Sequence, residues 1–257
     1  MGFGPRGEPA VERAVREVRA ALRRRASPRR AAGMRAYFKR DETVAFYGVT
    51  LPAARALARD VWRRYRDAWS VADAIRFCDV LMRDAEFEAK CVGVIVLERW
   101  RREFPRSLFG TVRRWLAEGH AATWAAVDLV APALVPPLLR RYPAQVATVR
   151  AWTAARSLWV RRAAAVAFVP FARRGEHLTV AYAVARRLFG DPHDLIHKCV
   201  GWLLREAGKT DPRRLERFLR RYGPRMPRTT LRYAIERYPP AQRARLLRET
   251  RPAARSG

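Results

Sequence analysis

The chain has 257 residues, and its 53 basic and 24 acidic residues give a formal net charge of +29. Hydrophobic residues make up 49% of the sequence, which excludes a disordered tail despite the 30% of charged residues. A charge excess of this size in a folded protein favours a polyanionic partner, most often nucleic acid.

Cysteine usage and hydropathy point to a reducing compartment. The chain has three cysteines, Cys78, Cys91 and Cys199, too few and odd in number for a disulfide framework, so we expect buried thiols. No apolar run reaches the roughly 18 residues that a membrane span needs, and the N-terminus lacks the apolar core of a signal peptide. We therefore expect a cytoplasmic protein with no membrane contact.

Helical patterns dominate the chain. In residues 10–25, Val11, Val15, Val18 and Leu22 recur at steps of three and four, which makes one apolar helix face. Similar patterns predict helices over residues 53–66, 70–82, 86–101, 105–117, 143–153, 160–172, 176–188, 193–207, 212–221, 227–237 and 240–249. Proline or glycine separates many of them, and alternating strand patterns are absent. We expect one all-α domain over residues 1–257, with 1–9 and 250–257 less ordered.

The helices recur with a period. Apolar helical segments that begin with a polar residue start at Lys90, Asp128, Arg162, Lys198 and Arg232, at spacings of 38, 34, 36 and 34 residues. Two helices per unit at this spacing are typical of HEAT-like arrays, which stack into an α-solenoid with a concave binding face. The sequence therefore predicts a column of four cations interrupted by one anion, Asp128.

Asp128 lies in the apolar stretch "ATWAAVDLVAP", residues 122–132. An isolated carboxylate in such surroundings is costly unless it caps a helix, is paired or is used. Trp124 lies four residues earlier and shares its helix face, and Arg162 from the next repeat could pair with it. The alternative is that Asp128 is the N-cap of a short helix, although Ala131 stands where a capping box needs Glu or Gln.

Several stretches resemble a known family when taken together and in order. They are "MRAYFKR" (34–40), "FYGVTLPAAR" (46–55), "TWAAVD" (123–128), "SLWVRRAA" (157–164), "VGWLLREAGKTDP" (200–212) and "LRYAIERY" (231–238). They resemble the bacterial DNA alkylation repair proteins of the AlkD type, HEAT-like-repeat DNA glycosylases, over residues 34–237.

The resemblance implies a function and a site. It implies hydrolysis of the N-glycosidic bond of cationic alkylpurines in duplex DNA, chiefly N3-methyladenine and N7-methylguanine, by a monomer with no cofactor, no metal and no obligate protein partner. The family's catalytic aspartate matches Asp128, its two tryptophans match Trp124 and Trp202, its arginine matches Arg162 and its tyrosine matches Tyr37. The family's tandem Trp-Trp is Thr123-Trp124 here, a departure at the edge of the pocket.

We expect cations of the repeats to hold phosphates: Lys90, Lys198, Arg205, Lys209 and Arg232. Such contacts position a duplex without reading its sequence, so binding should weaken steeply with salt. Two alternatives for the whole protein are a non-catalytic relative that binds branched or distorted DNA, and a repeat scaffold for an acidic protein.

For several single residues, an interpretation other than the functional one also stays open. Arg162 could belong to a solvated Arg161–Arg162 surface pair, and Tyr37 could be a plain packing residue. His193 and His197 have the spacing of a metal pair but no third ligand on the same face. "GFGPRG" at residues 2–7 has the glycine spacing of a dinucleotide loop but no preceding strand.

Overall fold

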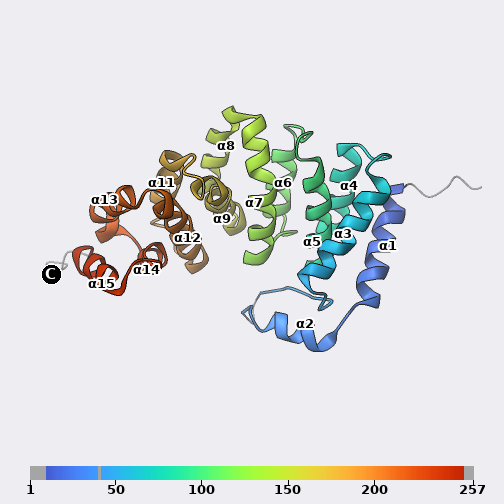
Figure 1. Ribbon diagram of the computed structural model, residues 1–257, viewed down its shortest axis with the longest axis horizontal. Coiled ribbons are helices and arrows are strands. Elements are labelled where there is room, and N and C mark those ends of the chain that lie inside the picture. Colours follow the sequence, from blue (N-terminus) through green and yellow to red (C-terminus); the bar gives the residue numbers. More distant parts are fainter. Residues whose placement is uncertain (1–9, 40–41, 252–257) are drawn as a thin grey trace, which may run out of the picture. The chain divides into compact units, whose positions relative to one another are not determined.

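The computed structural model describes residues 10–39 and 42–251 (Figure 1). Over these ranges the fold is all-α and has no β-strand, apart from one isolated bridge between Ala45 and Glu86, so the expected fold class is confirmed. The α-helices are α1 (Ala10–Arg24), α2 (Pro28–Arg35), α3 (Leu51–Tyr65), α4 (Val71–Met82), α5 (Phe87–Leu97), α6 (Leu108–Ala117), α7 (Trp124–Arg141), α8 (Val146–Ala151), α9 (Leu158–Val166), α10 (Val169–Ala172), α11 (Leu178–Arg187), α12 (Asp194–Thr210), α13 (Pro212–Tyr222), α14 (Arg228–Ala234) and α15 (Pro240–Glu249). Four short 3-10 helices accompany them: η1 (Glu98–Trp100), η2 (Pro143–Gln145), η3 (Trp152–Ala154) and η4 (Gly223–Arg225).

The chain divides into two compact units, Met1–Arg141 and Tyr142–Gly257. The prediction of one domain over residues 1–257 stays a prediction. The "GFGPRG" run and the N-terminal residues 1–9, which we expected to be less ordered, lie outside the described residues. Of the C-terminal range 250–257, which we also expected to be less ordered, residues 252–257 lie outside the described residues, whereas Thr250 is fully buried. Among the helices of the described ranges, none is long and apolar enough to cross a membrane.

In the first unit, α5 is the central helix. Its sequence FEAKCVGVIVL is apolar on almost every side, and a helix of that kind is stable only when other elements surround it. It packs against α1, α3, α4 and α7. Gly93 allows the close approach of α4, because a Cβ at this position would lie 3.3 Å from the Cα of Cys78.

In the second unit, α12 has the same role. It packs against α9, α10, α11, α13 and α14. Gly201 lets α14 lie directly on it, since a Cβ there would come within 2.3 Å of the Tyr233 Cβ. Gly208 does the same for α13, where a Cβ would meet the Leu215 side chain at 2.3 Å.

Among the differences from the sequence-based expectation are those at α7, at α2 and over residues 160–172. The predicted short helix from Asp128 is part of the longer α7, which begins at Trp124 and contains Pro132, Pro136 and Pro137. Helix α2 has no buried residue, so its sequence carried no periodic apolar signal. The helix expected over 160–172 is divided into α9 and α10 because Pro170, in the first turn of α10, has no N–H to continue the ladder.

Candidate active site and nucleic-acid interface

The start of α7 fixes the position of the candidate catalytic carboxylate. The Thr123 hydroxyl accepts a hydrogen bond from the N–H of Ala126 at 3.1 Å, as an N-cap side chain does. Trp124 is therefore the first residue of the helix, and Asp128 is half-buried one turn further along the same face. The alternative that Asp128 caps a short helix is wrong.

Proline shapes the same turn of α7. Pro132 has no backbone N–H, so it cannot give the carbonyl of Asp128 the usual helical hydrogen bond from four residues ahead. The regular ladder therefore lacks one hydrogen bond at Asp128, the residue that carries the carboxylate. Helix α7 nevertheless continues without a break from Trp124 to Arg141.

An aromatic cluster packs against the first residue of α7. The rings of Phe38 and Trp124 stack with centroids 5.1 Å apart and an interplanar angle of 20°. Phe46 lies 5.5 Å from Phe38, and Phe87 of α5 lies 6.0 Å from Phe46. Phe38 and Phe46 were not among the predicted site residues. Both lie in stretches that carry the family resemblance, but periodicity does not identify contacts between residues so distant along the chain.

Buried Glu88 of α5 anchors the loop that carries Phe46. Its carboxylate is 2% exposed and accepts backbone hydrogen bonds from Tyr47 (3.1 Å), Gly48 (2.8 Å) and Val49 (3.0 Å). Gly48 has a φ of +77°, and a Cβ there would lie 2.3 Å from the carbonyl oxygen of Ser27. The loop is therefore held by specific bonds on the side of α5 and by close packing on the side of α2.

Tyr37 is exposed and makes none of the ring contacts of this cluster. Its side chain is 82% exposed, whereas its neighbour Phe38 stacks on Trp124. The interpretation of Tyr37 as a plain packing residue is wrong. An aromatic side chain so exposed, next in sequence to the residue that stacks on Trp124, is available to an external ligand.

Lys90 is not the free surface cation that we expected. It is half-buried and donates a hydrogen bond to the carbonyl oxygen of Met82 at the end of α4, at 2.6 Å. Burial lowers the pKa of Lys90, and the nearby Asp84 opposes this shift. Lys90 and Asp84 line a cavity of about 370 Å³ that also reaches Thr123 and Ala126 at the start of α7.

In the second unit, Arg162 of α9 is buried. Its side chain is 5% exposed, and its Nη1 donates a hydrogen bond to the carbonyl oxygen of Leu195 in α12 at 2.6 Å. The adjacent Arg161 forms an ion pair with Asp191, with Nε and Oδ2 at 2.5 Å. The alternative of a solvated Arg161–Arg162 surface pair is therefore wrong.

The cations of α12 lie on one face, with Trp202 between them. Lys198, Trp202, Arg205 and Lys209 follow one another at helical spacing. Each cation has an acidic partner: Lys198 pairs with Asp194 at 2.7 Å, Arg205 with Glu236, and Lys209 with Glu206 at 2.8 Å. The predicted basic column is thus locally neutralised along α12.

Glu206 is the buried anion of this face. It is 1% exposed, and besides Lys209 it pairs with Arg173 at 3.1 Å, whose guanidinium also lies 5.8 Å from the Trp202 ring. Burial alone would raise the pKa of Glu206, but hydrogen bonds from Lys209 and Arg173 outweigh it, so the pKa is lowered. The carboxylate therefore stays ionised, held by Lys209 and Arg173.

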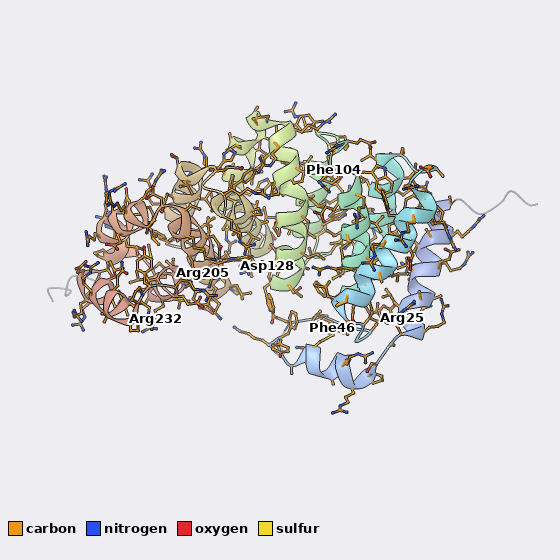
Figure 2. All side chains as sticks on the ribbon, in the orientation of Figure 1. Arg25, Phe46, Phe104, Asp128, Arg205 and Arg232 are labelled. Carbon is orange, nitrogen blue, oxygen red and sulfur yellow. The ribbon has the colours of Figure 1, made fainter. Side chains whose placement is uncertain are left out.

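Arg232 lies on α14 (Figure 2), and unlike the α12 cations it forms no ion pair among the described residues. Its side chain is exposed and has no carboxylate partner among the described residues. Its positive charge contributes to lowering the pKa of Arg228, a shift due mainly to the burial of Arg228. Of the expected phosphate ligands, Arg232 is the one whose charge is least compensated.

The remaining expectations concern histidines and thiols. His193 Nδ1 accepts the N–H of Leu195 at 3.2 Å and His197 Nε2 lies 2.6 Å from the Asp191 carbonyl oxygen, so both have structural partners. The described residues contain no cluster of histidine, cysteine, aspartate and glutamate suited to a metal ion. The three cysteines are buried as expected, and burial raises the pKa of Cys91 to about 12.

The predicted site residues fall into two sets, one in each unit. The first unit contains Tyr37, Lys90, Trp124 and Asp128, and the second contains Arg162, Lys198, Trp202, Arg205, Lys209 and Arg232. Trp124 and Asp128 share one face of α7, and the α12 residues share one face of their helix. That the two sets form one site, and that Arg162 pairs with Asp128, stay predictions.

Comparison with known proteins identifies the family of this chain. A family model described as "DNA alkylation repair enzyme" matches residues 18–238. A solved structure described as a predicted DNA alkylation repair enzyme from Enterococcus faecalis is similar at 18% identity and a TM-score of 0.71, covering 84% of this chain and 98% of that chain. At this identity the likeness bears on the fold alone. A search among curated proteins gave no match.

Proposed function

The chain belongs to the DNA alkylation repair enzyme family, and we propose that it is a monofunctional DNA glycosylase. Its substrates are cationic alkylpurines in duplex DNA: N3-methyladenine, N7-methylguanine and bulkier N3 or N7 adducts. The reaction is hydrolysis of the N-glycosidic bond, which leaves an abasic deoxyribose and a free base.

The observation that carries the proposal is the placement of one carboxylate. Asp128 is half-buried in α7, one turn from Trp124, and it caps no helix. A glycosidase that acts on a neutral leaving group generally needs two carboxyl groups, one of which protonates the leaving atom. An N3- or N7-alkylated purine is already cationic and leaves without an acid, so one carboxylate suffices to stabilise the developing oxocarbenium charge and orient water.

The aromatic residues beside Asp128 suit a cationic base. A tryptophan face attracts a cation by about 0.5 to 2 kcal/mol, depending on how far the pair is desolvated. Trp124 is only half-buried, and Phe38 stacks on it, which fixes the plane of the indole. A rigid indole next to a carboxylate favours a positively charged lesion over a normal base.

The test is release of free base by the Asp128→Asn variant. Methylated duplex DNA is incubated with each protein, and free N3-methyladenine and N7-methylguanine are measured by mass spectrometry. Removing a preorganised electrostatic group typically costs about 100-fold or more in rate. We expect a loss of that size with duplex affinity retained, because the substitution removes a negative charge from a DNA-binding surface.

The control is Asp67→Asn, which removes the same charge from an 88% exposed carboxylate of the same unit. It should leave excision unchanged. Excision by Asp128→Asn at the wild-type rate would refute the proposed role. Tight binding of methylated duplex by the wild-type protein without any release would favour the non-catalytic DNA-binding alternative.

A further inference from the structure

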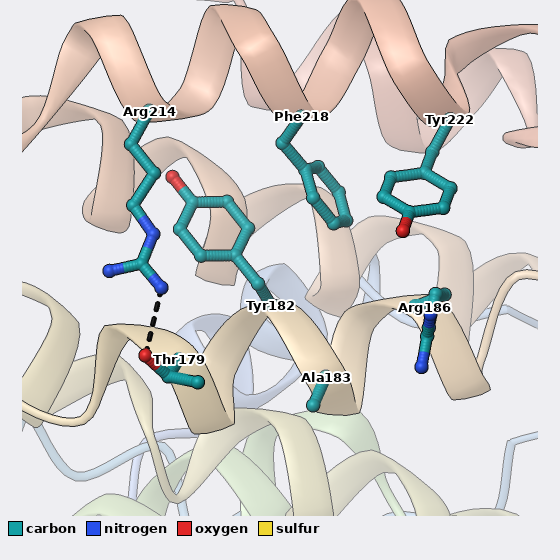
Figure 3. Close-up of a pocket in the computed structure, with 7 residues that line it drawn as sticks. All are labelled: Thr179, Tyr182, Ala183, Arg186, Arg214, Phe218 and Tyr222. Carbon is teal, nitrogen blue, oxygen red and sulfur yellow. Dashed lines mark hydrogen bonds between the residues drawn. The ribbon is translucent and has the colours of Figure 1, made fainter.

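We propose that the cavity between α11 and α13 binds one unpaired nucleobase and an adjoining phosphate, and so forms a single-stranded DNA contact on the second unit. The cavity has a volume of about 240 Å³. Its lining residues are Thr179, Tyr182, Ala183 and Arg186 from α11 and Arg214, Phe218 and Tyr222 from α13 (Figure 3). None of them belongs to the candidate active site described above.

The walls of the cavity are aromatic. Tyr182 and Phe218 have ring centroids 4.7 Å apart at 46°, and Phe218 and Tyr222 lie 4.9 Å apart at 50°. Tilted rings of this kind do not close face to face on one another. Pockets for drug-sized ligands measure about 300–1,000 Å³, so this smaller cavity suits a single planar ring system. Nucleobases stack on such aromatic platforms without regard to sequence.

Arginines provide positive charge at both ends of the cavity. Arg214 lies 5.1 Å from the Tyr182 ring centroid and donates a hydrogen bond to the Thr179 hydroxyl at 2.8 Å. Arg186 lies 5.9 Å from the Tyr222 ring at the other end (Figure 3). Neither arginine has a carboxylate partner within the described part of the chain, in contrast to Arg173 and Arg205 of the same unit. Uncompensated guanidinium groups beside aromatic faces suit a phosphate next to a stacked base.

Tyr182 supplies an independent sign of a missing ligand. Its side chain is 6% exposed, and its hydroxyl is buried without a hydrogen-bond partner among the described residues. Figure 3 shows this hydroxyl at the same end of the cavity as Arg214. The hydroxyl is protonated at neutral pH, as tyrosine ordinarily is, and burial raises its pKa further, so it can donate a hydrogen bond. A phosphate or base oxygen at this end would accept from both Tyr182 and Arg214.

The chemistry favours an unpaired base over a duplex. A base in duplex DNA is stacked on both faces and paired along its edge, so it cannot enter a cavity between two helices without leaving the helix. An unpaired base has a free face and a free edge. We therefore commit to a flexible single strand, such as the strand around a lesion that has lost its pairing, with the base on the aromatic wall and a phosphate on Arg214.

The experiment measures affinity of the full chain for a labelled thymidine decamer, an abasic decamer and a matched duplex, by fluorescence anisotropy at fixed salt. Stacking of one base is worth about tenfold in affinity, so the wild-type protein should bind the abasic strand about tenfold more weakly. Tyr182→Phe and Arg214→Gln should each weaken binding of the thymidine strand about three- to tenfold and change duplex binding less than twofold.

Arg217→Ala is the matched control, because Arg217 is exposed on α13, one residue from Phe218, and does not line the cavity. It should weaken strand and duplex binding equally. Photocrosslinking of a strand that contains 4-thiothymidine should label residues 178–187 or 212–222. The proposal would be overturned by crosslinks elsewhere or by equal affinity for the abasic and thymidine strands. It would also be overturned if Tyr182→Phe weakened strand binding no more than Arg217→Ala does. Competition by thymidine monophosphate as strong as by the decamer, or by an acidic tyrosine peptide, would overturn the choice of a strand.

Discussion

Replacing Glu88 by alanine should release the loop of residues 42–50 from α5, because three backbone N–H groups lose their acceptor. Glu88 is 2% exposed, and its oxygens accept from Tyr47, Gly48 and Val49 over 2.8 to 3.1 Å. The bonds to Gly48 and Val49 are buried, and the bond to Tyr47 is partly buried.

The size of the effect follows from these bonds. A buried donor left without a partner costs about 1–3 kcal/mol, so two such donors and the partly buried third predict a loss of about 3–5 kcal/mol in the free energy of unfolding. Glu88→Gln keeps one oxygen, which can still serve Gly48 and Val49, but it turns an amide N–H₂ toward the N–H of Tyr47. Its loss should be about 1–3 kcal/mol.

The assay combines urea unfolding with hydrogen exchange of single amides. The loop can also open by itself, in which case the global loss is smaller and the amides of Gly48 and Val49 exchange fast while those of α5 stay protected. Glu86→Ala, two residues away and without a side-chain bond to the start of α5, is the control and should cost less than about 1 kcal/mol. A Glu88→Ala protein with unchanged stability and unchanged protection of Gly48 and Val49 would refute the reasoning.

Three further predictions concern the site and its charges. Phe38→Leu removes the ring that stacks on Trp124, and such a ring pair contributes about 0.5–1.5 kcal/mol. Excision kinetics should therefore show a rate lowered up to about tenfold, with duplex affinity unchanged. An unaltered rate would exclude Phe38 as a positioning residue. Because the folded-state pKa of Glu206 is lowered, its carboxylate stabilises the fold at pH values above the ordinary pKa of 4.5, and this stabilisation is lost as the pH falls through the folded-state pKa. Between about pH 6 and pH 3, the melting temperature should therefore fall more steeply for the wild-type protein than for Glu206→Gln. Parallel curves of melting temperature against pH would contradict this. Arg232→Ala should reduce the slope of log affinity against log salt for duplex DNA by about one, and Lys209→Ala by clearly less; equal slopes would show that the ion pair of Lys209 does not matter.

The helices that the sequence predicted well are those with a clear apolar face. Helix α1, with Val11, Val15 and Leu22 buried, begins and ends within one residue of the expected range 10–25. Helix α7 was the hardest to predict, because prolines normally indicate a helix break. Burial of residues such as Val127 and Leu134 stabilises it as a helix nevertheless. Tertiary packing therefore overrode local propensity where the surrounding helices supplied the stabilisation.

The site could be predicted in part, for a related reason. Repeat spacing selected Asp128, because equivalent positions of a repeat have similar surroundings. Helical spacing added Trp124, four residues earlier, and the two do share a face of α7. Phe38 and the anchor Glu88 could not be found in this way. Their contacts join segments far apart in sequence, and neither helical periodicity nor repeat spacing identifies such contacts.

Pairing of charges changes what the net charge of +29 implies for DNA binding. Lys198 has an exposed partner, and since exposed pairs are worth about 0–1 kcal/mol, a phosphate can replace that carboxylate at little cost. Arg205 and Lys209 hold a buried glutamate, and leaving it unpaired would cost about 3–5 kcal/mol, so they can contact phosphate only with donors that the glutamate does not use. Lys90 is half-buried on a helix end, whereas Arg232 is exposed and has no carboxylate partner in the described residues. The electrostatic contribution to duplex binding should therefore come unequally from the predicted cations, with Arg232 and Lys198 contributing most per residue.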